Sequence, residues 1–521
     1  MSKTDSPSVL VIGAGVGGLA TALRLLCAGF SVTVLERAPR PGGKMRQISV
    51  GDDVFDGGPS VMTMPWVLDE LLAVAGVARK DVLSLTPLAP LCRHFFVDGT
   101  VLDLFSDEPT PAGASEEAAW ARSAEEIGRV LGARSAEDYR RFRRHAAAIY
   151  RAVEGPFLRR PLPQGPIDIL SKFNFGDLFG MRHLDAARSL WRALGSQFSD
   201  ERLRVLFARY ATYSGANPFI APATLAVIAH VELAFGVYAV GGGMYSLANL
   251  LAELITRRGG QIRCGADVER IEIDETAGRA SAVFVAGERL AADYVVANCD
   301  AAQLYARQLA GSRPGDKHAR AITALEPSLS AYLNLFVVAG QGVAELPLVH
   351  HNVFFSADYE REWQELRSGP PSDPTVYLCN PDYGASRQRW FCLTNSPPLP
   401  GTGPSPQTLD RWARCRGRVA DKLAQARLPL AEVLQGEGAV TPGDFAALFP
   451  FSRGAIYGPA ASSRLGAFAR PRNRVPGVEN LFCVGGSTHP GAGVPMVMLS
   501  AAIVSELLQA THRRRIGSRA A

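Results

Sequence analysis

Residues 7–36, PSVLVIGAGVGGLATALRLLCAGFSVTVLE, constrain the fold of this chain more than any other segment. A β-branched run at 8–12 leads into the glycines GAGVGG, an apolar helical pattern covers 19–28, and a second β-branched run covers 31–36. A strand, a glycine turn, a helix and a strand within about 30 residues predict a βαβ unit that binds a dinucleotide. The chain therefore requires a mainly parallel sheet with helices packed on it.

Each glycine of this turn has a predicted physical purpose. Gly13 permits the tight turn, Gly15 lets the backbone approach a pyrophosphate, and Gly18 lets the helix pack closely on the strand. The pyrophosphate is expected at the helix N-terminus, where free N–H groups and the helix dipole favour anions. The predicted cofactor-binding residues of this turn are Gly13, Ala14, Gly15, Gly17 and Gly18.

An acidic residue and a second glycine turn narrow the choice among NAD, NADP and FAD. Glu36 ends the second strand, where its carboxylate accepts hydrogen bonds from a ribose and repels a 2′-phosphate, which disfavours NADP. The fingerprint alone leaves NAD and FAD open. PRPGGKMR at 39–46 follows directly, and DGGPSVMT at 56–63 adds a third turn with exposed backbone. An NAD domain does not need such turns there, so they favour FAD.

The fingerprint followed by R-x-G-G-K-x-R at 40–46 resembles the flavin-containing amine oxidase and carotenoid desaturase superfamily. In that superfamily the second turn closes over FAD near its pyrophosphate and ribityl chain. The resemblance implies an FAD cofactor and adds flavin-side residues from the acidic strand end and the later turns. These are Arg37, Gly42, Gly43, Lys44, Arg46, Gly58, Pro59 and Ser60.

The far end of the chain carries a matching pattern. Residues 480–508 contain a strand that ends in two glycines, the loop THPGAGVPM and an amphipathic helix, again a site for backbone contact with an anion. This segment is similar to the terminal flavin motif of carotenoid desaturases, which implies that Gly485, Val494, Pro495 and Met496 face FAD. Residues 240–271 resemble the segment that places Val268 near adenine, and 293–301 resemble a strand that returns to the sheet. A role of both segments in the core alone stays open.

These segments predict an α/β (α+β) chain with a discontinuous FAD-binding domain. We expect this Rossmann-type domain to comprise residues 1–80, 240–305 and 475–510. Residues 81–239 and 306–474 are expected to form a substrate domain with a mixed sheet, including strands at 333–340 and 375–381, and a helical region. Within that region 155–184 is either a surface loop or a lip that contacts a membrane.

Composition excludes several function classes. The net charge of +5 comes from scattered basic residues, so no nucleic-acid surface is indicated. The eight cysteines occur singly, without a C-x-x-C pair, so no metal site is predicted. The most apolar segment, 219–240, contains Pro222, His230 and Glu232, which favours a buried element over a membrane span.

Two stretches, 57–76 and 87–107, look closest to the desaturases of 1-hydroxylated acyclic carotenoids. That resemblance implies hydride loss from the allylic C4 of a 1-hydroxy or 1-methoxy end group to flavin N5, then proton loss from C3, giving the 3,4 double bond. The polyene stabilises the cation itself, so no strong protein base is required. A phytoene desaturase, a carotenoid isomerase or saturase, and a non-catalytic prenyl-binding protein are the alternatives.

Catalytic residues are not identified by the motifs. His94, Arg209 and His230 are the candidates, with Tyr213 as a further wall residue, and structural roles for all of them stay open. We expect a polar group deep in an apolar wall to meet the 1-hydroxyl and to discriminate against the unhydroxylated carotenoid. The expected partners are an acyclic C40 carotenoid, a membrane surface and an unidentified electron acceptor. The expected location is the cytoplasm, peripherally on the inner or photosynthetic membrane.

Overall fold

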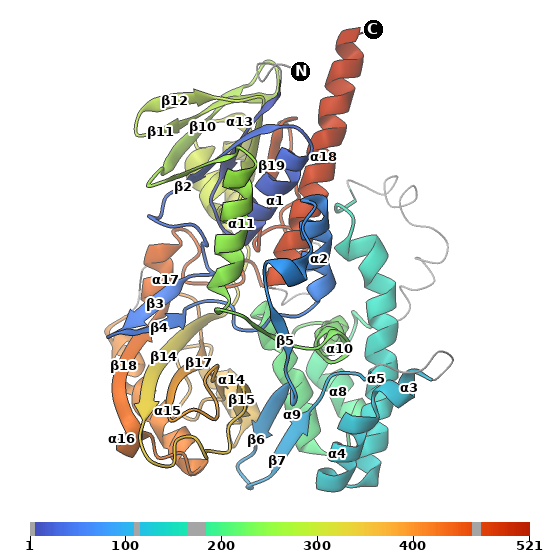
Figure 1. Cartoon of the computed structure of the whole chain (residues 1–521), viewed down its shortest axis with the longest axis vertical. Helices are drawn as coiled ribbons and strands as arrows, with labels where there is room; N and C mark the ends of the chain where they lie inside the picture. Colours follow the sequence, from blue (N-terminus) through green and yellow to red (C-terminus); the bar gives the residue numbers. More distant parts are fainter. Residues whose placement is uncertain are drawn as a thin grey trace.

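A parallel sheet lies in the upper half of the molecule as it is drawn in Figure 1. The computed structural model describes residues 6–108, 115–163, 184–401, 403, 405–460 and 470–520. The five strands of this sheet follow the order β19-β13-β1-β2-β9, and every neighbouring pair is parallel. Segments far apart in sequence thus meet in one sheet, as the discontinuous domain requires. The strands are β1 (Ser8–Ile12), β2 (Ser31–Glu36), β9 (Gln261–Cys264), β13 (Tyr294–Ala297) and β19 (Leu481–Cys483).

Alternating residues of β1 cover the two faces of this sheet, as the pleat requires. Val9 and Val11 pack into a core with helices α1 (Val16–Cys27), α2 (Pro65–Val74), α11 (Tyr245–Arg257) and α18 (Val494–Ala520). Leu10 and Ile12 pack on the other side, against a three-stranded antiparallel sheet. That sheet consists of β10 (Val268–Asp274), β11 (Arg279–Val285) and β12 (Glu288–Ala291), next to α12 (Ala301–Gln303) and α13 (Arg313–Thr323) (Figure 1).

A seven-stranded mixed sheet forms the lower half, in the order β18-β14-β17-β16-β15-β6-β7. Only β15 and β6 pair in parallel. The predicted strands at 333–340 and 375–381 are confirmed. The strands are β6 (Cys92–Phe95), β7 (Val101–Leu104), β14 (Ser330–Ala339), β15 (His351–Phe354), β16 (Val376–Cys379), β17 (Arg387–Ser396) and β18 (Leu434–Val440).

The two faces of β14 also separate two cores. Phe336 and Val338 pack against α15 (Pro406–Gln425) and α16 (Leu430–Val433), which cover the outer face. Leu333 and Leu335 point inward, toward the pair β3 (Gln47–Val50) and β4 (Asp53–Asp56) and toward α17 (Pro442–Leu448). This inward face of the sheet is directed toward the half of the molecule that contains the five-stranded parallel sheet.

A helical region packs against β6 and β7 through a core rich in aromatic side chains (Figure 1). The predicted buried element at 219–240 is confirmed as α10 followed by strand β8 (Tyr238–Val240), which pairs with β5 (Leu85–Pro87). The candidate lip at 155–184 lies mostly outside the described residues. The helices are α3 (Glu116–Ala119), α4 (Ala121–Leu131), α5 (Ala133–Val153), α8 (Leu190–Gln197), α9 (Glu201–Ala208), α10 (Ala226–Phe235) and α14 (Tyr359–Glu365).

Among the described residues, one helix is long and apolar enough to cross a membrane by length and composition alone, Val494–Ser518. Of its apolar window 61% is buried inside the molecule, a property that core helices share. It packs on α1 and α2 and carries the basic stretch 512–515, where His512 contacts Phe30 and Tyr294. The other end of the helix starts at the predicted terminal flavin motif.

Candidate active site

One cavity of about 840 Å³ runs from the glycine turns to the inward face of the seven-stranded sheet. It lies at the carboxyl ends of the parallel strands, the usual ligand position in such sheets. The predicted residues that line it are Gly13, Gly15, Gly17, Glu36, Arg37, Gly42, Gly43, Lys44, Arg46, Gly58, Pro59, Ser60, Val268, Arg209, Gly485, Val494 and Pro495. The predicted residues absent from its lining are Ala14, Gly18, Met496, His94 and His230.

The first glycine turn is closed by backbone contacts that exclude side chains. Gly13 has a φ of +96° and donates its N–H to Leu35 O at 2.7 Å. A Cβ on Gly18 would lie 2.1 Å from Gly13 O, closer than real Cβ contacts allow. Gly18 therefore serves helix packing from behind the turn, while Gly15 and Gly17 present backbone to the cavity.

Glu36 occupies the end of β2 and is only 8% exposed. Its Oε2 accepts the Ala14 N–H at 2.6 Å and its Oε1 accepts the Ala38 N–H at 2.8 Å. Each carboxylate oxygen keeps a second lone pair for a ligand hydroxyl. The acid is thus rigidly placed where the sequence predicts a ribose.

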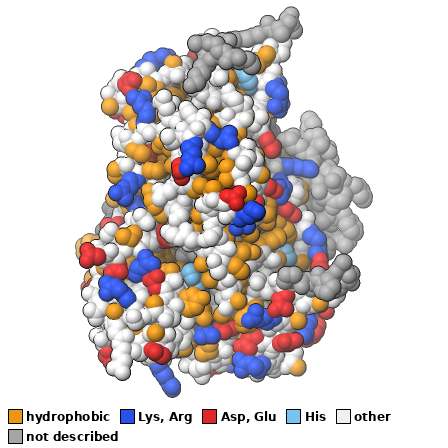
Figure 2. Space-filling model, viewed as in Figure 1, with side chains coloured by type: hydrophobic (Ala, Val, Ile, Leu, Met, Phe, Trp, Pro, Cys, Tyr) orange, Lys and Arg blue, Asp and Glu red, His pale blue; other side chains and the backbone are white. Residues whose placement is uncertain are grey.

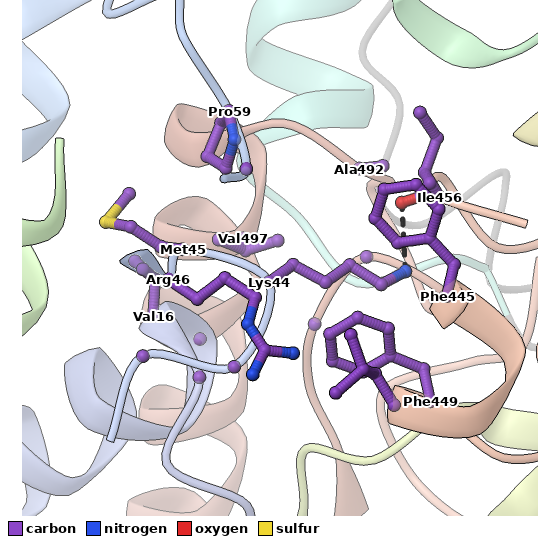
Figure 3. A pocket seen from close by; sticks show the side chains of 18 of the residues that line it. Val16, Lys44, Met45, Arg46, Pro59, Phe445, Phe449, Ile456, Ala492 and Val497 are labelled. Carbon is purple, nitrogen blue, oxygen red and sulfur yellow. Dashed lines mark hydrogen bonds between the residues drawn. The ribbon is translucent and has the colours of Figure 1, made fainter. Parts of the chain in front are cut away.

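The second glycine turn lies directly on the first. Gly42 donates its N–H to Ala14 O at 2.8 Å, and at its φ of +124° a Cβ would lie 2.2 Å from Met45 O. Lys44 extends across the cavity between Phe445 and Phe449, and its Nζ donates to Ile456 O at 2.9 Å (Figure 3). Burial lowers the pKa of the Lys44 ammonium, and the Asp300 carboxylate counteracts part of that effect.

Asn298 joins the turns from both ends of the chain, and the motifs did not identify it. Its Nδ2 donates to Gly13 O at 3.3 Å, and its Oδ1 lies 2.7 Å from where a Cβ on Gly485 would be. It directly follows β13, the strand that the sequence predicts to return to this sheet. The sequence signal that could have identified Asn298 is its position directly after a predicted parallel strand.

These contacts form a cradle that fits FAD. Glycine backbone lines one wall, the buried carboxylate of Glu36 stands at the end of β2, and α1 and α18 both begin at the cavity. Helix N-termini and exposed backbone N–H groups suit a pyrophosphate. Gly13, Gly15, Glu36, Gly42 and Gly485 are therefore the residues that would hold it.

The half of the cavity beyond the cradle is largely apolar. Its wall consists of Ala331, Leu333, Phe391, Leu393, Phe445, Phe449 and Ile456. Arg209, Thr212 and Tyr213 line the cavity from the helical side, and Tyr377 lines it from strand β16 of the sheet. Tyr377 is already occupied, because its hydroxyl lies 2.8 Å from Ser60 Oγ and 2.8 Å from His351 Nδ1.

The structure separates the three catalytic candidates. Arg209 lines the cavity, whereas His94 is completely buried outside its lining and places Nδ1 3.1 Å from Leu102 O. Burial, reinforced by the charge of Arg209, lowers the pKa of His94 to about 3. His230 packs against Tyr150 and Phe235, and burial lowers its pKa to about 3. Both histidines are neutral near pH 7.

Glu232 pairs with tyrosines and not with His230. Tyr210 donates its hydroxyl to Glu232 Oε1 at 2.7 Å, and Tyr213 donates to Oε2 at 2.5 Å. The Glu232 carboxylate is thus held between two phenols, although His230 lies only two residues before it in the chain. This places a buried negative charge beside Arg209.

His350, His351 and Cys379 form a buried group in the described part of the chain whose possible metal-ligand atoms lie within 4.8 Å of one another. Burial raises the pKa of the Cys379 thiol to about 12. His351 Nδ1 is engaged by Tyr377. His351 Nε2 is buried and has no hydrogen-bond partner among the described residues.

Comparisons with known proteins show the family of this chain. The family model of flavin containing amine oxidoreductases matches residues 16–339. A hydroxyneurosporene desaturase from Cereibacter sphaeroides is 39% identical, with 97% of this chain and 98% of that protein covered. A second hydroxyneurosporene desaturase, from Rubrivivax gelatinosus, is 37% identical, with 96% and 93% covered. A 4,4′-diapolycopene oxygenase from Methylomonas sp. is 32% identical, with 98% and 99% covered.

Solved structures show the same fold at lower sequence identity. Putrescine oxidase bound to putrescine gives a TM-score of 0.61 at 17% identity, with 98% of this chain and 99% of that chain covered. Cyclohexylamine oxidase from Brevibacterium oxydans gives 0.60 at 16% identity, with 98% and 100% covered. The predicted fold class is confirmed.

Proposed function

Because this chain belongs to the flavin-containing amine oxidoreductases and, within them, to the carotenoid desaturases, we propose that it desaturates an acyclic carotenoid whose end group carries a 1-hydroxyl or 1-methoxyl. FAD is its cofactor. The observation that carries the proposal is the single cavity in which the glycine cradle continues into an apolar wall. A long polyene needs such a wall, with few polar groups to orient it.

The chain's own residues bind, orient and exclude water. FAD, which Gly13, Gly15, Glu36, Gly42 and Gly485 would hold, would supply the hydride acceptor for a reaction in which the substrate loses a hydride from the allylic C4 and a proton from C3 and gains the 3,4 double bond. Phe391, Leu333 and Phe445 provide an apolar surface that aligns the polyene and keeps water out. Neutral His94 and His230 do not take part, since neither borders the cavity.

The named relatives support the substrate class. Proteins called hydroxyneurosporene desaturase are 35–39% identical to this chain over nearly its full length. The 32% relative is named an oxygenase, which acts on a carotenoid backbone too. Product identity therefore discriminates the proposed desaturation from a terminal oxygenation.

We also propose that the protein works at a membrane surface, because a C40 hydrocarbon dissolves in lipid and not in water. Figure 2 shows hydrophobic side chains gathered over the middle of one face, with charged groups of both signs around them. Cosedimentation with vesicles should deplete the protein from the supernatant. If it stays in solution with vesicles of both anionic and neutral lipid, the membrane proposal is wrong.

The test of function uses FAD-loaded protein with liposomes that contain neurosporene, 1-hydroxyneurosporene, 1-methoxyneurosporene or phytoene. Oxygen and a quinone are supplied in separate arms as electron acceptors. The expected result is a product of the oxygenated substrates that has lost two hydrogens and absorbs further to the red. Conversion of phytoene alone, a product isomeric with its substrate, an oxygenated product, or a protein that retains no FAD would each contradict it.

A further inference from the structure

Arg209 is a buried cation with free hydrogen-bond donors at the cavity wall. It begins the short helical turn Arg209–Ser214, lines the cavity, and is 5% exposed. Its Nε and Nη2 are buried and have no hydrogen-bond partner among the described residues. Buried donors are almost always satisfied, so this pair requires an acceptor.

The charge of Arg209 is compensated without using those donors. Its guanidinium lies 5.1 Å from the Tyr210 ring centroid and 5.5 Å from that of Tyr213. The two phenols donate to different oxygens of Glu232, and Arg209 Nε and Nη2 make no hydrogen bond to this carboxylate. The cluster therefore stabilises a positive charge in the wall and leaves its N–H groups available.

On the basis of the proposed function, we propose that Arg209 determines substrate specificity by donating a hydrogen bond to the oxygen on C1 of the carotenoid end group. Three other polar side chains line the cavity, but each already has a partner: Thr212 donates to Arg209 O, Tyr213 donates to Glu232, and the Tyr377 hydroxyl lies 2.8 Å from His351 Nδ1. Two donors of Arg209 have no partner among the described residues. A carotenoid without the oxygen would leave the Arg209 donors buried and unpaired, which is how polar sites reject the analogue that lacks a group.

The donor-only chemistry of a guanidinium gives this proposal a specific signature. Arginine has no acceptor, so it recognises the oxygen lone pairs of a hydroxyl and of a methyl ether alike. A site that read the hydroxyl as a donor, through a carboxylate such as Glu232, would reject the ether. We expect comparable kcat/KM for 1-hydroxy- and 1-methoxyneurosporene, and a much lower value for neurosporene.

The test measures the ratio of kcat/KM for 1-hydroxyneurosporene to that for neurosporene in FAD-loaded variants. Arg209→Met should lower the ratio about tenfold to a hundredfold, the usual loss for a hydrogen bond to a charged group. Arg209→Lys keeps the charge but not the fork of donors, and should lie between. Arg209→Met/Glu232→Gln removes both buried charges, so it guards against misfolding caused by an unpaired Glu232. Arg192→Gln, exposed on α8, is the matched control and should keep the wild-type ratio.

Several outcomes would overturn the proposal. One is an unchanged ratio in variants that retain FAD and turn over either substrate. Another is a wild-type enzyme that converts the hydroxylated substrate but rejects the methyl ether. Failure of the proposed function itself looks different, because the wild type would then convert neither oxygenated substrate, whatever the residue at position 209.

Discussion

Glu36 binds two backbone N–H groups and also faces the cavity, so its charge serves the protein and the cofactor together. Glu36→Gln replaces one acceptor oxygen by an NH₂ group that opposes a backbone donor. We expect the FAD dissociation constant to rise about tenfold to a hundredfold, because hydrogen bonds to a buried charge are each worth about 1.5–3 kcal/mol.

Quenching of FAD fluorescence on titration with apoprotein measures this constant. Glu253→Gln is the control, because Glu253 pairs with Arg257 on the exposed surface of α11, where an ion pair contributes little. Equal affinities for Glu36→Gln and wild type would contradict a cofactor role for the carboxylate.

His94 makes stability depend on pH in a predictable direction. Its pKa falls from 6.5 to about 3 on burial, so the folded state binds fewer protons than the unfolded chain between these values. Its stabilising contribution is present above pH 6.5 and is lost as the pH falls toward 3. The free energy of unfolding of the wild type should fall between pH 6.5 and pH 5. In His94→Gln this fall should be smaller by about 1.5 kcal/mol.

Urea unfolding followed by tryptophan fluorescence at several pH values measures this difference. Parallel pH profiles for the variant and the wild type would show that His94 titrates normally in the fold. Activity near pH 7 should not follow the His94 pKa, because the ring is neutral there and does not border the cavity.

The sequence motifs identified Glu36 and left Asn298 unidentified. An acid at the end of the second strand has a fixed spacing from the glycine fingerprint, so its position follows from local pattern. Asn298 contacts Gly13 across 285 residues, and that contact exists only because β13 lies beside β1. The sequence predicted Arg209 as a candidate residue. It could not predict that the Arg209 donors lack a partner, because this depends on Tyr210 and Tyr213 donating to Glu232 in the folded structure.

At the scale of elements, helix α1 depends on a glycine, Gly18, that is absent from the cavity lining. Gly18→Ala would place a Cβ 2.1 Å from Gly13 O and force α1 away from β1. We expect a loss of about 1–3 kcal/mol in stability, the usual cost of overpacking, together with weaker FAD retention.

Gly417→Ala is the matched control. Gly417 also lies within a helix, α15, but a Cβ there meets nothing within 4 Å. Alanine should stabilise that helix by about 0.5–1 kcal/mol. Thermal unfolding and FAD content of both variants test the pair, and equal behaviour would contradict the packing role of Gly18.

Strands were predictable where their composition is strongly β-prone, as in β14 and β16. Their pairing was not, because β15 joins β6 in parallel through a crossover that spans the helical region. Helix α18 begins at the cavity and continues as a long apolar helix. Its composition alone resembles that of a membrane span. Its packing on α1 accounts for the same apolar residues.

At the scale of the molecule, the fold depends on segments after residue 405 for both halves. Strand β18 pairs with β14, β19 pairs with β13, and α18 packs on α1. Cleavage at a protease site inserted after Gly401, which is exposed and follows β17, should leave the two fragments associated with FAD bound.

Size-exclusion chromatography with flavin absorbance measures the association, and the uncut protein with the same insertion is the control. Release of FAD or separation of fragments without denaturant would show that the covalent link, and not the sheets, holds the halves together. The domain boundaries drawn from sequence stay predictions, since strand pairing alone does not define where one unit ends.

The strand order β19-β13-β1-β2-β9 also has a consequence for biosynthesis. A ribosome that adds about 5–20 residues per second needs about 20–90 s to travel from the end of β2 to β19. During that time β1, β2 and α1 are already made. Strand β19 at the edge of the sheet and helix α18, which packs on α1, are not yet made. The nascent chain therefore exposes this apolar surface until β19 and α18 have been made, and we expect cofactor loading to be a late event in biosynthesis.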